Sequence, residues 1–157
     1  MSDTRLPPAA IHAGALPPHR GASYPPPHDE PCRTRARTML GDLFGITDFG
    51  VNLLTLQPGG WSSQRHWHSS EDEFVYVLEG TPTLVTESGE TRLIPGMCAG
   101  FPAGAADGHH LVNRSDRPVL LLEVGSRKPG DVVDYPDIDL RWDSAAERYS
   151  RKNGEPL

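Results

Sequence analysis

The chain has 157 residues, which suits one domain rather than two of full size. It carries 15 Lys and Arg against 21 Asp and Glu, a formal net charge of −6. This balance disfavours nonspecific binding to nucleic acid and to anionic lipid, because both need a basic face. There is no apolar run of membrane-spanning length, no N-terminal apolar stretch typical of a secretory signal peptide, and no CxxC motif. We therefore expect a cytoplasmic protein that binds neither nucleic acid nor membrane.

Proline is concentrated in residues 1–37. Eight of the 16 prolines lie within the first 31 residues, where they favour extended backbone and exclude helix or central strand. The segment predicts an extended or disordered arm, or one that packs on its own domain or on a partner subunit. Arg33, Arg35 and Arg37 alternate along it. We expect these guanidiniums to be solvated or paired with acidic C-terminal residues, with phosphate binding as an alternative.

Short strands separated by turns follow in residues 38–126. In chain order, the predicted strands are 49–57, 64–68, 73–78, 82–86, 91–94, 97–101, 109–113 and 119–124. Their spacing, with Gly and Pro between them, is typical of an all-β sandwich or barrel. Residues 127–157 are acidic and predict an extension packed on the barrel, with a short helix at 144–150 and a frayed end.

Two histidines and a glutamate stand close together in the sequence. His66 and His68 are two residues apart, so on a strand their imidazoles share one face. Glu73 opens the next predicted strand and can reach the same side. Two imidazoles and a carboxylate from neighbouring strands form a plausible divalent metal site. His109 and His110 are the candidates for a fourth ligand.

This stretch resembles the cupin superfamily, whose members have two short motifs. The first, G-x5-H-x-H-x3,4-E-x6-G, matches at Gly60, His66, His68, Glu73 and Gly80. The second, G-x5-P-x-G-x2-H-x3-N, matches at Gly96, Pro102, Gly104, His109 and Asn113, but four residues rather than two precede the histidine. The spacing to Asn113 selects His109 over His110.

The resemblance implies an all-β, double-stranded β-helix (jelly-roll) barrel with extended N- and C-terminal arms. It also implies one divalent transition metal, Mn²⁺, Zn²⁺, Fe²⁺ or Ni²⁺, held inside one end of the barrel by His66, His68, Glu73 and His109. Cupin barrels commonly pair through their sheets, so a homodimer is expected.

Two further residues are candidates for catalysis. Gln64 lies two residues before His66 and is expected on the same inward face, and Asp107 lies in the expanded loop, where a general base would fit.

The chain is similar to small bacterial cupins often labelled sugar-phosphate isomerases. It is therefore expected to be a metal-dependent isomerase or lyase of a sugar, a sugar phosphate or a carboxylate. The alternatives are a non-catalytic cupin that binds or senses a small molecule, and an iron-dependent oxygenase.

Overall fold

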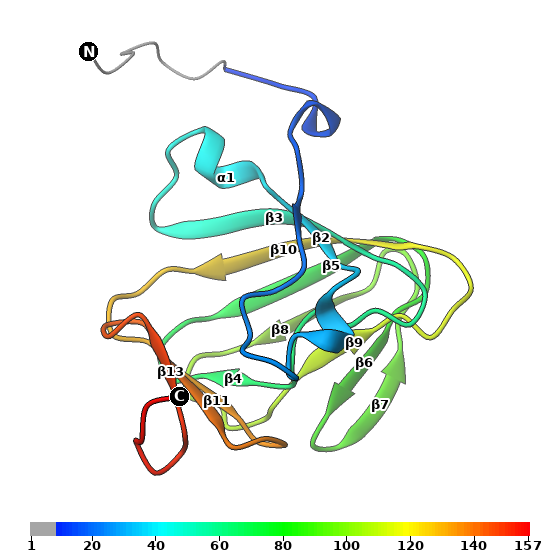
Figure 1. Cartoon of the computed structure of the whole chain (residues 1–157). Coiled ribbons are helices and arrows are strands. Elements are labelled where there is room, and N and C mark those ends of the chain that lie inside the picture. Colours follow the sequence, from blue (N-terminus) through cyan, green and yellow to red (C-terminus); the bar gives the residue numbers. More distant parts are fainter. Residues whose placement is uncertain (1–8) are drawn as a thin grey trace.

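The computed structural model describes residues 9–157, and antiparallel strands form most of it (Figure 1). The strands are β1 (His19–Arg20), β2 (Ala36–Met39), β3 (Phe49–Leu56), β4 (Trp67–His68), β5 (Glu73–Glu79), β6 (Thr83–Thr86), β7 (Gly89–Arg92), β8 (Cys98–Phe101), β9 (His110–Val112), β10 (Val119–Ser126), β11 (Val132–Tyr135), β12 (Leu140–Asp143) and β13 (Arg148–Ser150). One helical turn, α1 (Leu40–Leu43), and two 3-10 turns, Ala13–Ala15 and Glu30–Cys32, accompany them. Among the described residues, no helix is long and apolar enough to cross a membrane.

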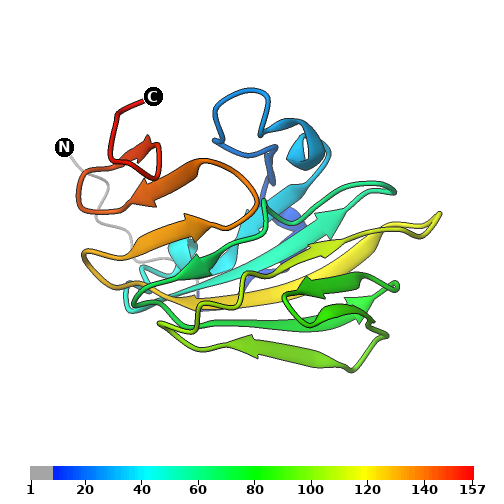
Figure 2. The same ribbon diagram turned by 90° about the horizontal axis from the view of Figure 1, so that it is seen from below.

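The strands are arranged in three sheets that enclose one interior (Figure 2). The large sheet has the order β1-β2-β3-β10-β5-β8, and the two smaller ones have the orders β13-β12-β11-β4 and β7-β6-β9. The longest ladder joins β3 and β10, from Phe49 opposite Ser126 to Leu56 opposite Val119. This arrangement confirms the predicted jelly-roll barrel.

The interior has an apolar end and a polar end, and the inward faces of β5 and β10 run from one to the other. Val75 and Val77 are buried in the core, whereas Glu73, which shares their face of β5, reaches the polar end. On β10, Leu121 belongs to the core and Glu123 lines the polar cavity. The core cluster comprises Leu54, Leu56, Val75, Val77, Leu93, Leu111, Val119 and Leu121.

Gly80, which ends the first motif, shows why that position needs glycine. Its φ is +80°, and an added Cβ would lie 2.8 Å from the Pro118 carbonyl oxygen. A side chain would therefore be strained and would also collide with the turn before β10.

The N-terminal arm and the C-terminal extension pack together over the polar end. The Tyr24 ring meets Tyr135 edge to face at a centroid distance of 5.6 Å and lies 6.0 Å from Tyr149. The predicted helix at 144–150 is wrong, because this segment turns back as β13. Tyr149 there pairs with Trp142 of β12, with ring centroids 4.7 Å apart, and this cross-strand packing overrides a weak helical preference.

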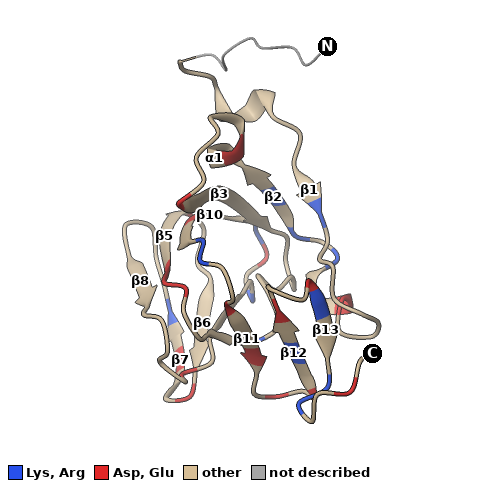
Figure 3. Cartoon of the chain, turned by 90° about the vertical axis from the view of Figure 1, so that its left-hand side faces the viewer, with Lys and Arg blue, Asp and Glu red and all other residues tan. Residues whose placement is uncertain are grey.

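In the large sheet, strands β3 and β8 contain no charged residue (Figure 3), and the outer face of β5 is apolar. On β5, Phe74, Tyr76 and Leu78 are 41%, 37% and 39% exposed on this side. The predicted homodimer stays a prediction.

The buried amide of Asn113 gives a test of this fold. Its Nδ2 donates to the carbonyls of Leu56 (2.9 Å) and Arg117 (2.7 Å), and its Oδ1 accepts from the Ser115 amide. Asn113→Ala leaves these buried groups unpaired, so we expect the free energy of unfolding in urea to fall by about 2–4 kcal/mol. The same change at exposed Asn153 should shift it by less than about 0.5 kcal/mol. If Asn113→Ala and Asn153→Ala lowered the free energy of unfolding equally, the structural role of the Asn113 amide would be contradicted.

Candidate metal centre

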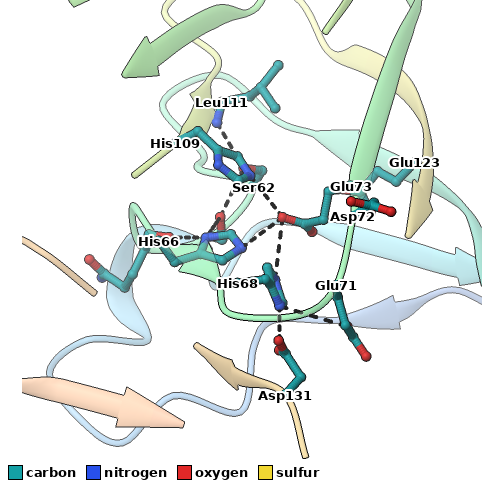
Figure 4. A network of polar contacts seen from close by, with 12 residues as sticks. Ser62, His66, His68, Glu71, Asp72, Glu73, His109, Leu111, Glu123 and Asp131 are labelled. Atoms are coloured by element: carbon teal, nitrogen blue, oxygen red, sulfur yellow. Dashed lines mark hydrogen bonds and ion pairs between the residues drawn. The ribbon is translucent and has the colours of Figure 1, made fainter. Parts of the chain in front are cut away.

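Three imidazoles converge on one oxygen of Glu73 (Figure 4). The Nε2 atoms of His66, His68 and His109 lie 3.3, 3.4 and 2.8 Å from Glu73 Oε2. His68 belongs to β4, Glu73 opens β5, and His109 directly precedes β9. The structure therefore brings together the four ligands predicted from the sequence.

Backbone pairing places His109 beside His66. The two residues form an isolated antiparallel bridge, in which each amide donates to the carbonyl of the other, at 3.1 and 2.9 Å. His110 consequently points the other way. Its Nδ1 lies 3.0 Å from the Ser63 carbonyl, and its ring packs edge to face on Trp61.

Hydrogen bonds behind the imidazoles set their orientation. His66 Nδ1 donates to the Gln64 carbonyl (2.8 Å), and His68 Nδ1 donates to Asp131 Oδ2 (2.7 Å). With the proton on Nδ1, the Nε2 lone pair of each ring faces the centre, which is the tautomer a metal ligand needs. The His109 ring is fixed differently, by stacking on Phe101 at a centroid distance of 3.5 Å.

The cluster carries negative charge in a half-buried place. Burial acts to raise the pKa of the Glu73 carboxyl, but the neighbouring imidazoles of His109 and His66 hold it well below its ordinary value. For His109, burial lowers the pKa of the imidazole and favours its neutral form. A carboxylate that stays ionised among imidazole nitrogens attracts a cation.

The ligand atoms of His66, His68 and Glu73 lie within 4.8 Å of one another, close enough to share a single ion, and His109 joins this group through its contact with Glu73. Two ligands at about 2.1 Å from an ion and at right angles to each other lie about 3 Å apart, close to the 2.8–3.4 Å between each Nε2 and Glu73 Oε2. Three nitrogens and one carboxylate suit Mn²⁺, Fe²⁺, Ni²⁺ or Zn²⁺. The residues present thus fit the predicted metal.

A second group of potential ligands, His68, Glu71 and Asp131, lies behind the first. Its oxygens are already engaged, since Asp131 Oδ1 accepts from the Ser70 amide (2.9 Å) and Glu71 Oε1 from the Lys128 amide (2.7 Å). This group therefore supports His68 rather than forming a separate site.

A cavity of about 270 Å³ opens beside the cluster. Polar and aromatic side chains from the barrel and from both arms line it. They include Tyr24, Arg35, Arg37, Ser62, Ser63, Glu123, Tyr135 and Tyr149. A small polar molecule would fit there in contact with a metal.

The two predicted catalytic residues lie outside this cavity. The Gln64 side chain donates from Nε2 to the His28 carbonyl (2.7 Å), tying the arm to the barrel. Asp107 accepts from the Glu87 amide (2.8 Å) on the exposed surface. Neither lines the cavity, because the Gln64 side chain is buried against the N-terminal arm and the expanded loop keeps Asp107 on the surface.

Sequence reasoning missed Asp131 and Glu123 as site residues. Asp131 is 63 residues from the histidine it holds, within an acidic segment that offers no local motif. The sequence does contain a signal for Glu123, because it is a single charged residue at an inward position of an otherwise apolar strand.

Comparison with known proteins agrees with this geometry. Residues 52–125 match the Cupin domain family. A structure described as a sugar phosphate isomerase of the cupin superfamily from Silicibacter pomeroyi is 41% identical, with a TM-score of 0.90 over 94% of this chain and 96% of that one. A candidate sugar phosphate isomerase from Acidithiobacillus ferrooxidans is 34% identical, with a TM-score of 0.70 over 74% of each chain.

More distant similarity concerns the fold alone. A polyketide cyclase from Streptomyces resistomycificus is 21% identical, with a TM-score of 0.60 over 78% of this chain and 82% of that one. No curated protein matches the sequence. The two motifs, the barrel and the extended similarity to the S. pomeroyi structure show that the chain belongs to the cupin superfamily.

Proposed function

We propose that the chain is a divalent-metal-dependent isomerase of a small hydroxycarbonyl compound, such as a sugar phosphate. The observation that carries this proposal is the convergence of three imidazole nitrogens and one carboxylate oxygen at the wall of a polar cavity. The names of the two similar structures support the substrate class.

His66, His68, Glu73 and His109 would hold the metal. When bound, a divalent ion supplies Lewis-acid stabilisation of negative charge that develops on a substrate oxygen. Four protein ligands leave positions open for that oxygen if the ion is five- or six-coordinate. These positions would face the cavity, since the barrel wall supplies the ligands.

Isomerisation also moves a proton between neighbouring carbons, so the cavity needs a group that accepts and returns it. Among the described residues that line the cavity, Glu123 has the one carboxylate that does not belong to the ligand cluster. Arg37 fixes its position, with Nε 3.0 Å and Nη2 3.4 Å from the two carboxylate oxygens. In our proposal Glu123 takes the role that sequence reasoning gave to Asp107.

Deuterium exchange tests the proposed activity. The purified chain, analysed for metal, is incubated with aldose and ketose phosphates in D₂O. We expect deuterium at the carbon next to the carbonyl, because proton removal there precedes isomerisation. Glu123→Gln should abolish the exchange while the metal content stays unchanged. Tight binding without exchange for the whole panel would instead favour a non-catalytic binding protein.

The ligand set predicts which histidines matter for metal retention. His66→Ala and His68→Ala should each weaken metal affinity at least about 100-fold. A change to a residue that only hydrogen-bonds to a ligand weakens metal affinity by up to about 100-fold, and loss of a ligand should cost at least as much. The matched control is His110→Ala, another buried histidine beside the site. It should retain the metal content of the unmodified chain after dialysis, measured by elemental analysis. Full occupancy in the His66 and His68 variants would refute the site.

The hydrogen bond between Asp131 and His68 predicts a smaller effect on metal affinity when Asp131 is changed. Asp131→Asn keeps the side chain's shape but offers an amide donor to His68 Nδ1, which favours the tautomer with its proton on Nε2. We expect metal affinity to fall roughly 10- to 100-fold in a chelator competition assay. Asp134→Asn, three residues further on in β11 and paired with Arg141, should leave the affinity unchanged. A result in which both variants match the unmodified chain would contradict the role of Asp131.

A further inference from the structure

The alternating arginines of the N-terminal segment have three different environments. Arg33 is exposed and pairs with Asp29 at 2.8 Å. Arg35 and Arg37 instead line the cavity beside the metal ligands. The prediction that these residues are solvated or pair with the C-terminal extension therefore fails for the two inner ones.

Arg37 has a carboxylate partner inside the cavity. Its guanidinium forms two hydrogen bonds with Glu123, which compensates its charge. This pair is continuous with the large sheet, since Arg37 belongs to β2 and Glu123 to β10.

Arg35 has no such partner among residues 9–157. Its Nε donates to the Gly21 carbonyl at 2.8 Å, and its Nη1 donates to the Ser62 carbonyl. These acceptors are neutral, so they hold the guanidinium in place without cancelling its charge. Because Arg has five N–H donors in a planar fork, other donors stay without an acceptor in the described part of the chain.

Burial makes this arrangement unfavourable for the chain alone. The half-buried position and the neighbouring Arg37 both lower the pKa of Arg35, burial being the larger cause. An oriented and uncompensated guanidinium at a cavity wall is a typical arrangement for binding an anion.

The charges of the whole cavity point the same way. Its charged lining residues are two arginines, Arg35 and Arg37, and two glutamates, Glu73 and Glu123. These four charges balance, so a bound divalent cation would leave two excess positive charges. A substrate with one or two negative charges would neutralise them.

We propose that Arg35 binds an anionic group of the substrate, a phosphate or a carboxylate, while another oxygen of the same molecule faces the metal ligands. The claim deepens the proposed function and rests on it for the identity of the substrate. Arg35 would thereby determine specificity and position the reacting end, and its planar fork suits two oxygens of one anion.

Calorimetric titration of the full chain with inorganic phosphate and, separately, with acetate tests this at constant ionic strength. We expect Arg35→Gln to weaken binding of the preferred anion about 10- to 100-fold. Arg33→Gln, the same change two residues away on an exposed side chain, should have no effect. An Arg35-dependent preference for phosphate indicates a phosphate ester, and one for acetate indicates a carboxylic acid.

Two further variants separate this proposal from the metal site. In His68→Ala protein, which should lack the metal, the Arg35→Gln change should still reduce anion binding. If instead anion affinity is lost in His68→Ala but unchanged in Arg35→Gln, the anion binds the metal alone and Arg35 has no role. If the unmodified chain binds no metal, the proposed function is contradicted, but the effect of Arg35→Gln on anion binding still tests the role of Arg35.

Arg35→Lys covers the case in which Arg35→Gln does not fold. It keeps the charge but loses the fork, so we expect a several-fold loss of affinity. Unchanged anion affinity in folded Arg35→Gln would overturn the proposal, and where Arg35→Gln does not fold, unchanged affinity in Arg35→Lys would overturn it. A lack of measurable binding of either anion by the unmodified chain would also overturn it.

Discussion

Three imidazole nitrogens and one carboxylate oxygen point at the same spot, and the rest of the site depends on this convergence. With Nδ1 of His66 and His68 donating outward to Gln64 and Asp131, their Nε2 lone pairs meet the ionised Glu73. Lone pairs at such short range repel one another unless a shared cation lies between them. The arrangement thus favours binding of a metal, and the hydrogen bonds behind the rings maintain it.

The barrel can hold these charged groups because its interior has an apolar end and a separate polar end. Residues of one face of β5 and β10 pass from Val77 and Leu121 in the core to Glu73 and Glu123 in the cavity. The apolar end supplies burial that stabilises the fold, so the polar end can hold charged groups at low exposure. The antiparallel ladder between β5 and β10 fixes the position of each carboxylate relative to the core.

The two arms complete the site rather than extend away from it. The N-terminal segment contributes Tyr24, Arg35 and Arg37 to the cavity. The C-terminal sheet adds Tyr135, and Asp131 just before β11 supports His68. The similarity to the S. pomeroyi structure covers 94% of the chain, so it includes most of both arms. A barrel alone would thus have metal ligands without the groups that we assign to orienting a substrate.

The strands of the barrel and three of the four candidate metal ligands could be predicted from the sequence by local rules, whereas His109 was chosen through the resemblance to the cupin motifs. Strand alternation and turn residues define the strands, and His66, His68 and Glu73 lie within eight residues of one another. The groups that surround these four residues could be identified only from the tertiary packing. It turned Gln64 toward His28, left Asp107 at the surface, replaced a predicted helix by β13, and brought Arg35 and Asp131 to the site from distant segments. Such contacts depend on how the two arms fold over the barrel, and no local spacing encodes that packing.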